Sequence, residues 1–364
     1  MESAKPPLSL GKSLLVPSVQ ELVTQSMNTI PPRYVRPELE YTRIITSSVE
    51  IPVIDFRKFY TRESIESELE KLHLACRDWG FFQLVNHGVS CSLIEKIKAE
   101  IQQFFRLPIE EKKRYWQQPG DLEGFGQSFV VSEEQKLDWS DSFFLILLPP
   151  EQRKSHLYGN LPPSFRETLE AYSQEQEKLA KELMVLMAKA LGIEKRDVVE
   201  VFEGGLQAMR MNCYPPCPRP EEAIGLSSHS DASGLTFVLQ LNDVEGLQIR
   251  KDGFWVLVKP LPDAFIVNIG DALEIVTNGI YPSIEHRVVV NSDKERLTIA
   301  TFNSPKLGGE VGPARSLITK EKPARFKTVA TERYLKEFFA RKLEGKSNLE
   351  YLMIEEAIGE ETKM

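Results

Sequence analysis

Two histidines and one aspartate have the residue types and the spacing of a metal site. His229 and Asp231 stand two positions apart, just before an apolar segment, and His286 begins another apolar segment further along the chain. Side chains two positions apart on an extended chain point to the same side, so His229 and Asp231 can bind one ion together. With His286 as third ligand, three coordination positions stay open, which is how non-haem iron is held when it activates oxygen. The spacing alone also allows a simpler interpretation, in which His229 lies in a polar turn and His286 only begins a strand.

Residues 296–302 alternate like a β-strand, and one face of this strand is chemically mixed. Period two places Arg296, Thr298 and Phe302 on the same side. A guanidinium and a hydroxyl suit a carboxylate, and an aromatic ring suits an apolar ligand, so this face fits the wall of a cavity that holds both. The alternative is an exposed strand with a solvated arginine.

A second segment, residues 206–214, alternates in the same way and puts Arg210, Asn212 and Tyr214 on one face. The amide and the phenol can donate hydrogen bonds to the same ligand. A proline-rich stretch follows at once and ends the strand, because proline cannot donate to a sheet ladder.

The elements that must position these residues change in type along the chain. Helical periodicity dominates the first half, and its longest pattern begins at Ser164, which forms a capping box with Glu167, and ends at Gly192. From residue 206 onward, short apolar segments alternate with turn residues and lack the helices that parallel crossovers need. We therefore predict an α+β fold with a helical N-terminal region and a double-sheet jelly-roll core.

The composition divides the chain into four segments. Residues 1–50 are rich in proline and form an N-terminal arm over the core, with one helical stretch at 18–27. Residues 51–165 make an N-terminal region, and residues 166–340 make the jelly-roll catalytic core with its scaffold helix. Residues 341–364 make a C-terminal tail whose acidic end we expect to fray.

Charge and cysteine content exclude several kinds of partner. The chain has 45 Lys and Arg against 53 Asp and Glu, a net charge of −8, without long basic runs. Nothing in this pattern favours nucleic acid or an anionic membrane as a partner. Four cysteines without a repeated spacing indicate a reducing compartment, and neither a signal peptide nor an 18-residue apolar stretch is evident. We expect a cytoplasmic monomer that binds a small molecule.

The motifs together resemble the plant Fe(II)- and 2-oxoglutarate-dependent dioxygenases. The resemblance covers nearly the whole chain, and its N-terminal segments look most like the branch of senescence-related dioxygenase-like proteins, opium-poppy O-demethylases and norcoclaurine synthase-like proteins. The motifs are His229-x-Asp231, His286, Arg296-x-Thr298, Asn212-x-Tyr214-Pro215-Pro216-Cys217, IPVIDF at 51–56, ACRDWGFFQLVNHG at 75–88, LPIEEKK at 107–113, GFGQ at 124–127, LDW at 137–139 and NGIYPSIEHR at 278–287.

This resemblance implies a double-stranded β-helix core of the cupin-like kind, with Fe(II) as metal, 2-oxoglutarate and O2 as co-substrates, and ascorbate as a stimulant. Three residues would then be iron ligands and four would hold the co-substrate. The ligands are His229, Asp231 and His286; Arg296 and Thr298 hold the distal carboxylate, with Tyr214 and Asn212 assisting. The family usually has serine at the position of Thr298, and the change keeps the hydroxyl.

The implied reaction is hydroxylation or oxidative O-demethylation of a small apolar metabolite, of alkaloid or phenylpropanoid type. We expect Phe302 and Phe144 to contact this substrate, with the pair Phe143 and Phe144 forming a lid over an aromatic, uncharged pocket. Ser304 stands where flavonoid-oxidising relatives carry a glutamate, which argues against a flavonoid. The rival function is a cupin-like protein that binds a small molecule without turnover.

Overall fold

The computed structural model describes residues 10–25, 28–37, 44–45 and 50–354. The fifteen strands in this part of the chain are β1 (Ile44–Ile45), β2 (Val53–Asp55), β3 (Phe81–Val85), β4 (Gly124–Gly126), β5 (Asp141–Leu148), β6 (Gln207–Tyr214), β7 (Leu226–His229), β8 (Leu235–Gln240), β9 (Leu247–Lys251), β10 (Phe254–Leu257), β11 (Phe265–Ile269), β12 (His286–Val288), β13 (Arg296–Asn303), β14 (Glu310–Val311) and β15 (Val329–Ala330). The α-helices are α1 (Val19–Val23), α2 (Ile65–Asp78), α3 (Cys91–Arg106), α4 (Ile109–Lys112), α5 (Ser155–Tyr158), α6 (Pro163–Leu191), α7 (Arg196–Phe202), α8 (Asp271–Val276), α9 (Thr331–Phe339) and α10 (Ser347–Glu350).

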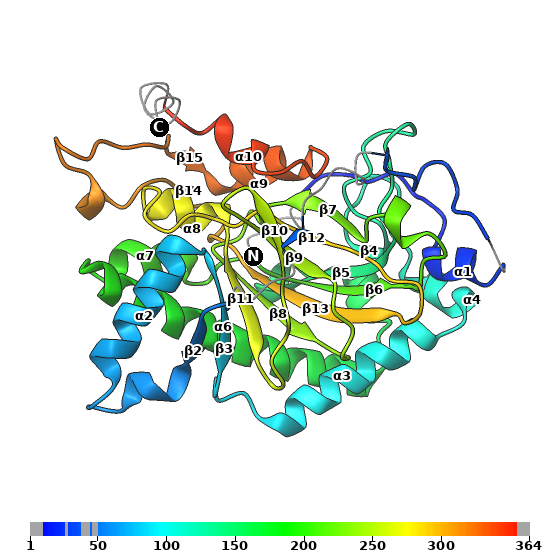
Figure 1. Ribbon diagram of the computed structural model, residues 1–364, viewed down its shortest axis with the longest axis horizontal. Helices are drawn as coiled ribbons and strands as arrows, with labels where there is room; N and C mark the ends of the chain where they lie inside the picture. Colours follow the sequence, from blue (N-terminus) through cyan, green and yellow to red (C-terminus); the bar gives the residue numbers. More distant parts are fainter. Residues whose placement is uncertain (1–9, 26–27, 38–43, 46–49, 355–364) are drawn as a thin grey trace, which may run out of the picture.

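Two large sheets form the core, so the predicted jelly roll is confirmed. The larger has the order β2-β3-β11-β8-β13-β6-β5-β4 and the smaller has the order β1-β10-β9-β12-β7. Neighbouring strands in both are antiparallel, except for the parallel pairs β2–β3 and β1–β10. Every segment after residue 206 that the sequence predicted as a strand lies in one of these sheets. Strands β7 and β12, which carry two of the candidate metal ligands, are neighbours at one edge of the smaller sheet (Figure 1).

Helices α2, α3 and α6 are grouped on one side of the strands (Figure 1). The amphipathic pattern of α3 explains its place there, because Ile94, Ile97 and Ile101 at helical spacing are all buried. Helix α6 begins at Pro163, with Pro162 as N-cap and no side-chain cap, so the predicted Ser164–Glu167 capping box is wrong. Proline is already shaped for the first helical position, which starts the helix one residue earlier.

The end of α6 agrees with the sequence. Gly192 takes a left-handed conformation with φ of 70° and caps the helix there. The domain boundary that we predicted between residues 165 and 166 falls inside α6 and stays a prediction. Residues 355–364, whose fraying was predicted, lie outside the described part of the chain.

A buried carboxylate fixes the N-terminal arm to the sheet. Asp141, at the start of β5, accepts hydrogen bonds from Ser18 Oγ at 2.7 Å and from the backbone N–H groups of Val19 and Gln20 at 2.9 and 2.8 Å. The N-terminus of helix α1 is therefore held against strand β5, which lies more than a hundred residues away in sequence. It is shorter than the predicted helix, which extended to Met27, a residue outside those that the structure describes.

Strand β5 was not predicted. After Asp141 and Ser142 its sequence FFLILL is an unbroken apolar run, which periodicity cannot assign to strand or helix. The strand is almost wholly buried because it pairs with β6 on one side and β4 on the other. Among the described helices, none is both long and apolar enough to cross a lipid bilayer.

Candidate metal centre and adjoining cavities

The three predicted ligands converge at the β7 edge of the smaller sheet. Strands β7 and β12 pair so that His286 stands opposite His229, and Asp231 follows β7 by two residues. Asp231 Oδ1 lies 3.4 Å from His229 Nε2 and 3.8 Å from His286 Nε2. The three potential ligand atoms all lie within 4.8 Å of one another, and the three residues are buried. This geometry contradicts the simpler interpretation of two unrelated histidines.

Backbone carbonyls orient both imidazoles. His229 Nδ1 lies 2.8 Å from the carbonyl oxygen of Ser227, and His286 Nδ1 lies 3.1 Å from that of Ile284. Since a carbonyl can only accept, each Nδ1 carries a proton and donates it, which places the lone pair of the neutral imidazole on Nε2. Both lone pairs therefore remain available for a metal, which is the usual arrangement of metal-binding histidines.

Asp231 uses its two carboxylate oxygens for different purposes. Oδ2 accepts hydrogen bonds from Thr236 Oγ1 at 2.7 Å and from Asn268 Nδ2 at 2.9 Å. Oδ1 faces the two histidine Nε2 atoms instead. Thr236 and Asn268 could not be identified from the sequence, because they lie on β8 and β11 and approach Asp231 only in the folded sheet.

The electrostatics of the cluster suit a divalent cation. Burial and, to a smaller extent, the neighbouring His229 lower the pKa of His286 to about 4, so this imidazole is neutral at physiological pH. Burial alone would raise the pKa of Asp231, but His286, His229 and the hydrogen bond from Thr236 outweigh burial and hold it well below its usual range. Two imidazole nitrogens and one carboxylate oxygen form a donor set that fits Fe(II).

A polar cavity extends from the cluster along β6 and β13. Arg296 pairs with Tyr214 and Thr298 pairs with Asn212 across these strands, and all four side chains line the cavity. Arg296 is only 3% exposed, which contradicts the alternative of a solvated strand face. One of its N–H groups donates to Gln240 Oε1 at 3.2 Å, while Nε has no acceptor among the described residues. A buried guanidinium with unused hydrogen-bonding capacity fits a carboxylate ligand.

Asn212 contacts the protein through every polar atom of its side chain. Its Oδ1 accepts a hydrogen bond from Arg210 Nε at 2.7 Å, and its Nδ2 donates to Thr298 Oγ1 and to the backbone oxygen of Arg210, both at 3.2 Å. The amide therefore positions Thr298 and Arg210. The sequence suggested that Asn212 donates a hydrogen bond directly to a ligand. This geometry instead favours a role in which Asn212 acts on the ligand through its two neighbours.

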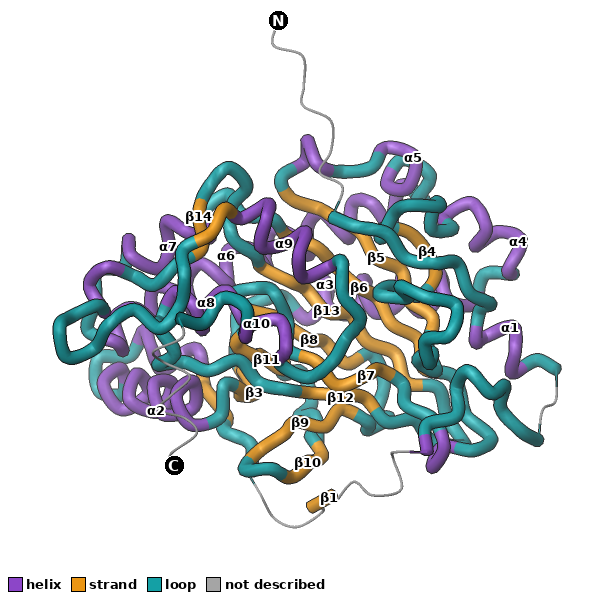
Figure 2. The backbone as a smooth tube through the Cα atoms, turned by 90° about the horizontal axis from the view of Figure 1, so that it is seen from above, coloured by secondary structure: helices purple, strands orange, loops and turns teal. Residues whose placement is uncertain are grey.

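An apolar cavity lies on the other side of the cluster, and Phe144 and Phe302 both line it. Its roof comes from α9 and from the segment before β5, where Phe129 stacks on Phe339 with ring centroids 5.5 Å apart. Figure 2 shows α9 near one end of β13. The apolar lining consists of Leu10, Phe129, Phe144, Leu206, Ala208, Ala232, Phe302, Leu335, Phe338 and Phe339.

Two expectations about this cavity need correction. Phe143 is not part of a lid, because it points to the opposite face of β5 from Phe144 and stacks on Phe104 at 4.5 Å in the core. The cavity is also not uncharged, because Arg210 lines it together with His229 and Asp231. Sequence alternation had placed Arg210 on the correct face, but nothing in the sequence said that this face borders two cavities.

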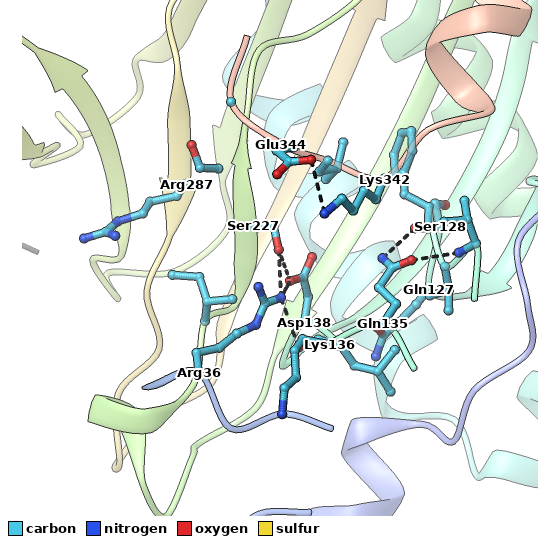
Figure 3. A pocket seen from close by; sticks show the side chains of 18 of the residues that line it. Arg36, Gln127, Ser128, Gln135, Lys136, Asp138, Ser227, Arg287, Lys342 and Glu344 are labelled. Atoms are coloured by element: carbon cyan, nitrogen blue, oxygen red, sulfur yellow. Dashed lines mark hydrogen bonds and ion pairs between the residues drawn. The ribbon is translucent and has the colours of Figure 1, made fainter. Parts of the chain in front are cut away.

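A third cavity of about 880 Å3 lies outside the roof and is polar. Figure 3 shows the cluster of Arg36, Asp138 and Ser227 in it, where Arg36 donates to both partners at 2.9 Å. Ser128 and Phe129 line both this cavity and the apolar one, so the Phe129 side chain separates the two. The apolar cavity itself has a volume of only about 50 Å3.

Comparisons with known proteins agree with this site. Residues 51–164 match the model for the non-haem dioxygenase in morphine synthesis N-terminal region, and residues 205–305 match the model for the 2OG-Fe(II) oxygenase superfamily. The chain is 55% identical to Protein SRG1 of Arabidopsis thaliana, covering 94% of this chain and 97% of that protein. It is 53% identical to codeine O-demethylase of Papaver somniferum, covering 95% and 98%. The fold is also similar to the crystal structure of JOX2 in complex with 2OG, Fe and JA, with a TM-score of 0.85 and 37% sequence identity. The match covers 93% of this chain and 98% of the JOX2 chain.

Proposed function

The chain belongs to the 2OG-Fe(II) oxygenase superfamily, whose members use Fe(II), 2-oxoglutarate and O2, and from this premise we propose its substrate class and the part of each residue. The substrate is a small, largely apolar and aromatic plant metabolite of alkaloid or phenylpropanoid type. The reaction is hydroxylation or oxidative O-demethylation. The observation that carries this proposal is the position of the His229–Asp231–His286 cluster between a polar cavity and an apolar one.

In this proposal His229, Asp231 and His286 hold Fe(II). When bound, the iron supplies the redox chemistry that activates O2 while 2-oxoglutarate is decarboxylated to succinate and CO2. Arg296 and the Thr298 hydroxyl bind the distal carboxylate of 2-oxoglutarate. Tyr214 lies beside Arg296, with the guanidinium 5.4 Å from the centre of its ring, and completes that end of the cavity. Burial raises the pKa of Tyr214, so its phenol keeps a proton that it can donate.

Phe302 and Phe144 then contact the substrate. Phe302 lines both cavities and pairs with Thr236, the hydrogen-bond partner of Asp231, so its ring lies at the level of the metal ligands. An aromatic wall there excludes water and holds a flat molecule with one carbon near the metal.

Substrate entry requires the roof to open. Small-molecule sites have volumes of roughly 300–1,000 Å3, whereas the apolar cavity holds only about 50 Å3. The Phe129–Phe339 stack separates it from the outer polar cavity, so parting these rings would join the two volumes. The outer cavity is thus the proposed entrance, and the roof closes over the bound substrate.

Demethylation has specific support from the relatives. Two proteins more than half identical to this chain are named codeine O-demethylase and, from Ocimum basilicum, oxoglutarate-dependent flavonoid 7-O-demethylase 1. Because the second of these relatives is named as a flavonoid demethylase, Ser304 alone is not a sufficient reason to omit flavonoids from a screen. We also propose that the protein acts as a cytoplasmic monomer without nucleic-acid or membrane partners, supported by its net charge of −8 and its few cysteines.

A screen of methoxylated alkaloids, phenylpropanoids and flavones tests the proposal. The protein is loaded anaerobically with Fe(II) and 2-oxoglutarate, each compound is added with air, and succinate and formaldehyde are measured. We expect at least one compound to give substrate-dependent succinate, with equimolar formaldehyde if a methoxy carbon is oxidised. Tight binding of a compound without succinate release would contradict turnover and favour the rival cupin-like binding protein.

A further inference from the structure

Arg210 is a buried cation at the junction of the polar and apolar cavities. It is 8% exposed, lies in the middle of β6 and lines both cavities. Its Nε donates to Asn212 Oδ1 at 2.7 Å, and among the described residues no carboxylate lies within ion-pair distance of its guanidinium. The two terminal nitrogens thus remain for a ligand. A buried charge without a counter-charge is costly, so a residue of this kind needs a ligand of opposite charge.

The strand register shows where along the cavity wall this charge lies. On the inner face of β6 and β13, Tyr214 pairs with Arg296 and Asn212 pairs with Thr298, which is the polar end. Further along, Ala208 pairs with Phe302, which is the apolar end. Arg210 lies between the two ends.

Arg210 also has room to reach a ligand there. It pairs with Ala300 on β13 and with Phe144 on β5. The small methyl group of Ala300 leaves space beside the guanidinium, and the Phe144 ring flanks it on the other side. The terminal nitrogens can therefore meet a molecule that enters from the apolar cavity.

A charge count over both cavities points to the source of the missing anion. The charged side chains that line them are Asp231, Arg296 and Arg210. This step rests on the proposed function, in which Fe(II) and the 2-oxoglutarate dianion occupy the polar side. With both bound, the three side chains, the iron and the co-substrate together carry a net charge of +1. The co-substrate is therefore insufficient to neutralise the site, and one further negative charge is needed.

We propose that Arg210 is a specificity-determining residue that binds an anionic group, a carboxylate or a phenolate, of the organic substrate. The substrate is then a flat, mostly apolar molecule with one acidic group, held so that a carbon elsewhere in the molecule lies next to the metal. Guanidinium pairs strongly with two oxygens at once, which fixes orientation as well as affinity. The other possible source of a carboxylate is 2-oxoglutarate itself, and the experiment must separate the two.

Benzoate and benzamide are a matched pair of probes, because they have the same shape and differ in charge. Their dissociation constants are measured by anaerobic calorimetry with protein loaded with Fe(II) and 2-oxoglutarate, so no turnover is needed. We expect the wild type to bind benzoate at least ten-fold more tightly than benzamide. Arg210→Met should abolish this preference and leave the benzamide constant within two-fold, while Arg210→Lys should restore part of it.

The 2-oxoglutarate dissociation constant, measured first in each protein, distinguishes the possible failures. If the wild type does not bind 2-oxoglutarate, the proposed function fails. If Arg210→Met weakens 2-oxoglutarate binding and leaves the benzoate preference intact, the arginine serves the co-substrate and the inference is overturned. A wild type that binds both probes equally, or neither at millimolar concentration, also overturns it.

Discussion

Thr236 donates a hydrogen bond to Oδ2 of Asp231 at 2.7 Å, and this contact leaves Oδ1 facing the two histidines. Thr236 is itself fixed by a 2.8 Å hydrogen bond with Ser233 Oγ. Because β8 carries Thr236 and the chain after β7 carries Asp231, the contact ties the larger sheet to the metal cluster. The orientation of the carboxylate therefore depends on a hydroxyl that does not contact the metal.

Removing this hydroxyl should weaken metal binding. Thr236→Val keeps the shape of the side chain, but the carboxylate loses one of the two partners that orient it. Outer partners of this kind are typically worth about 10- to 100-fold in metal affinity, and we expect a loss in that range. Anaerobic titration with Fe(II) measures it. Thr328→Val, at an exposed position, is the control, and equal affinity in all three proteins would show that Thr236 does not position Asp231.

Arg296→Lys should raise the apparent KM for 2-oxoglutarate ten-fold or more. A planar guanidinium that can pair with two oxygens is replaced by a point charge, at a loss of roughly 1.5–3 kcal/mol. Steady-state succinate release at varied 2-oxoglutarate concentration gives the value. Thr298→Ser keeps the hydroxyl and should change the KM little. An unchanged KM in Arg296→Lys would mean that the distal carboxylate binds elsewhere.

Phe302→Ala should lower kcat/KM for the substrate found in the screen by 10- to 100-fold, or about 1.4–2.8 kcal/mol. The ring lines both cavities at the level of the metal ligands, so its loss lets the substrate move away from the reacting position. The KM for 2-oxoglutarate should hardly change. Phe254→Ala, at a phenylalanine that is 37% exposed on β10, controls for loss of a ring. The opposite pattern, with 2-oxoglutarate binding lost and the substrate unaffected, would mean that Phe302 contacts 2-oxoglutarate and that the two cavities have been assigned to the wrong ligands.

Asp141→Asn should destabilise the protein and release the N-terminal arm. The carboxylate accepts three hydrogen bonds, and an amide has only one acceptor oxygen for those donors. Hydrogen bonds to charged groups are worth roughly 1.5–3 kcal/mol, so we expect a loss of about that size or more in the free energy of unfolding. Urea denaturation measures it, and Asp243→Asn, on an exposed aspartate, should be neutral. Equal midpoints for Asp141→Asn and the wild type would refute this anchoring.

The sequence predicted the inner face of the site because that face repeats with period two. Arg296, Thr298 and Phe302 alternate along β13, and their partners on β6 alternate in the same way, so both faces could be deduced without knowing the sheet order. The pairing of His286 with His229 could be suspected from their residue types. It could not be derived from periodicity, since four strands and a helix separate β7 from β12 in sequence order.

The roof of the apolar cavity could not be predicted. Phe129 lies in a loop, and Phe339 lies at the end of a helix more than 200 residues later; they meet only because the C-terminal segment packs back over the sheet. Its return is fixed by backbone contacts, such as that between Gly345 N–H and the oxygen of Ser228 at 2.9 Å. Such contacts do not depend on side-chain type, so the periodicity of the sequence cannot predict them.

Iron binding by single-ligand variants tests the central claim most directly. Wild type and the variants His229→Ala, Asp231→Ala and His286→Ala are incubated anaerobically with Fe(II), desalted and assayed for bound iron, with circular dichroism to confirm folding. We expect one Fe(II) per wild-type chain and at least a hundred-fold weaker binding in each variant. His156→Ala, at an exposed histidine of α5, should bind like the wild type. Full iron occupancy in any folded ligand variant would contradict the assignment of this cluster as the iron site.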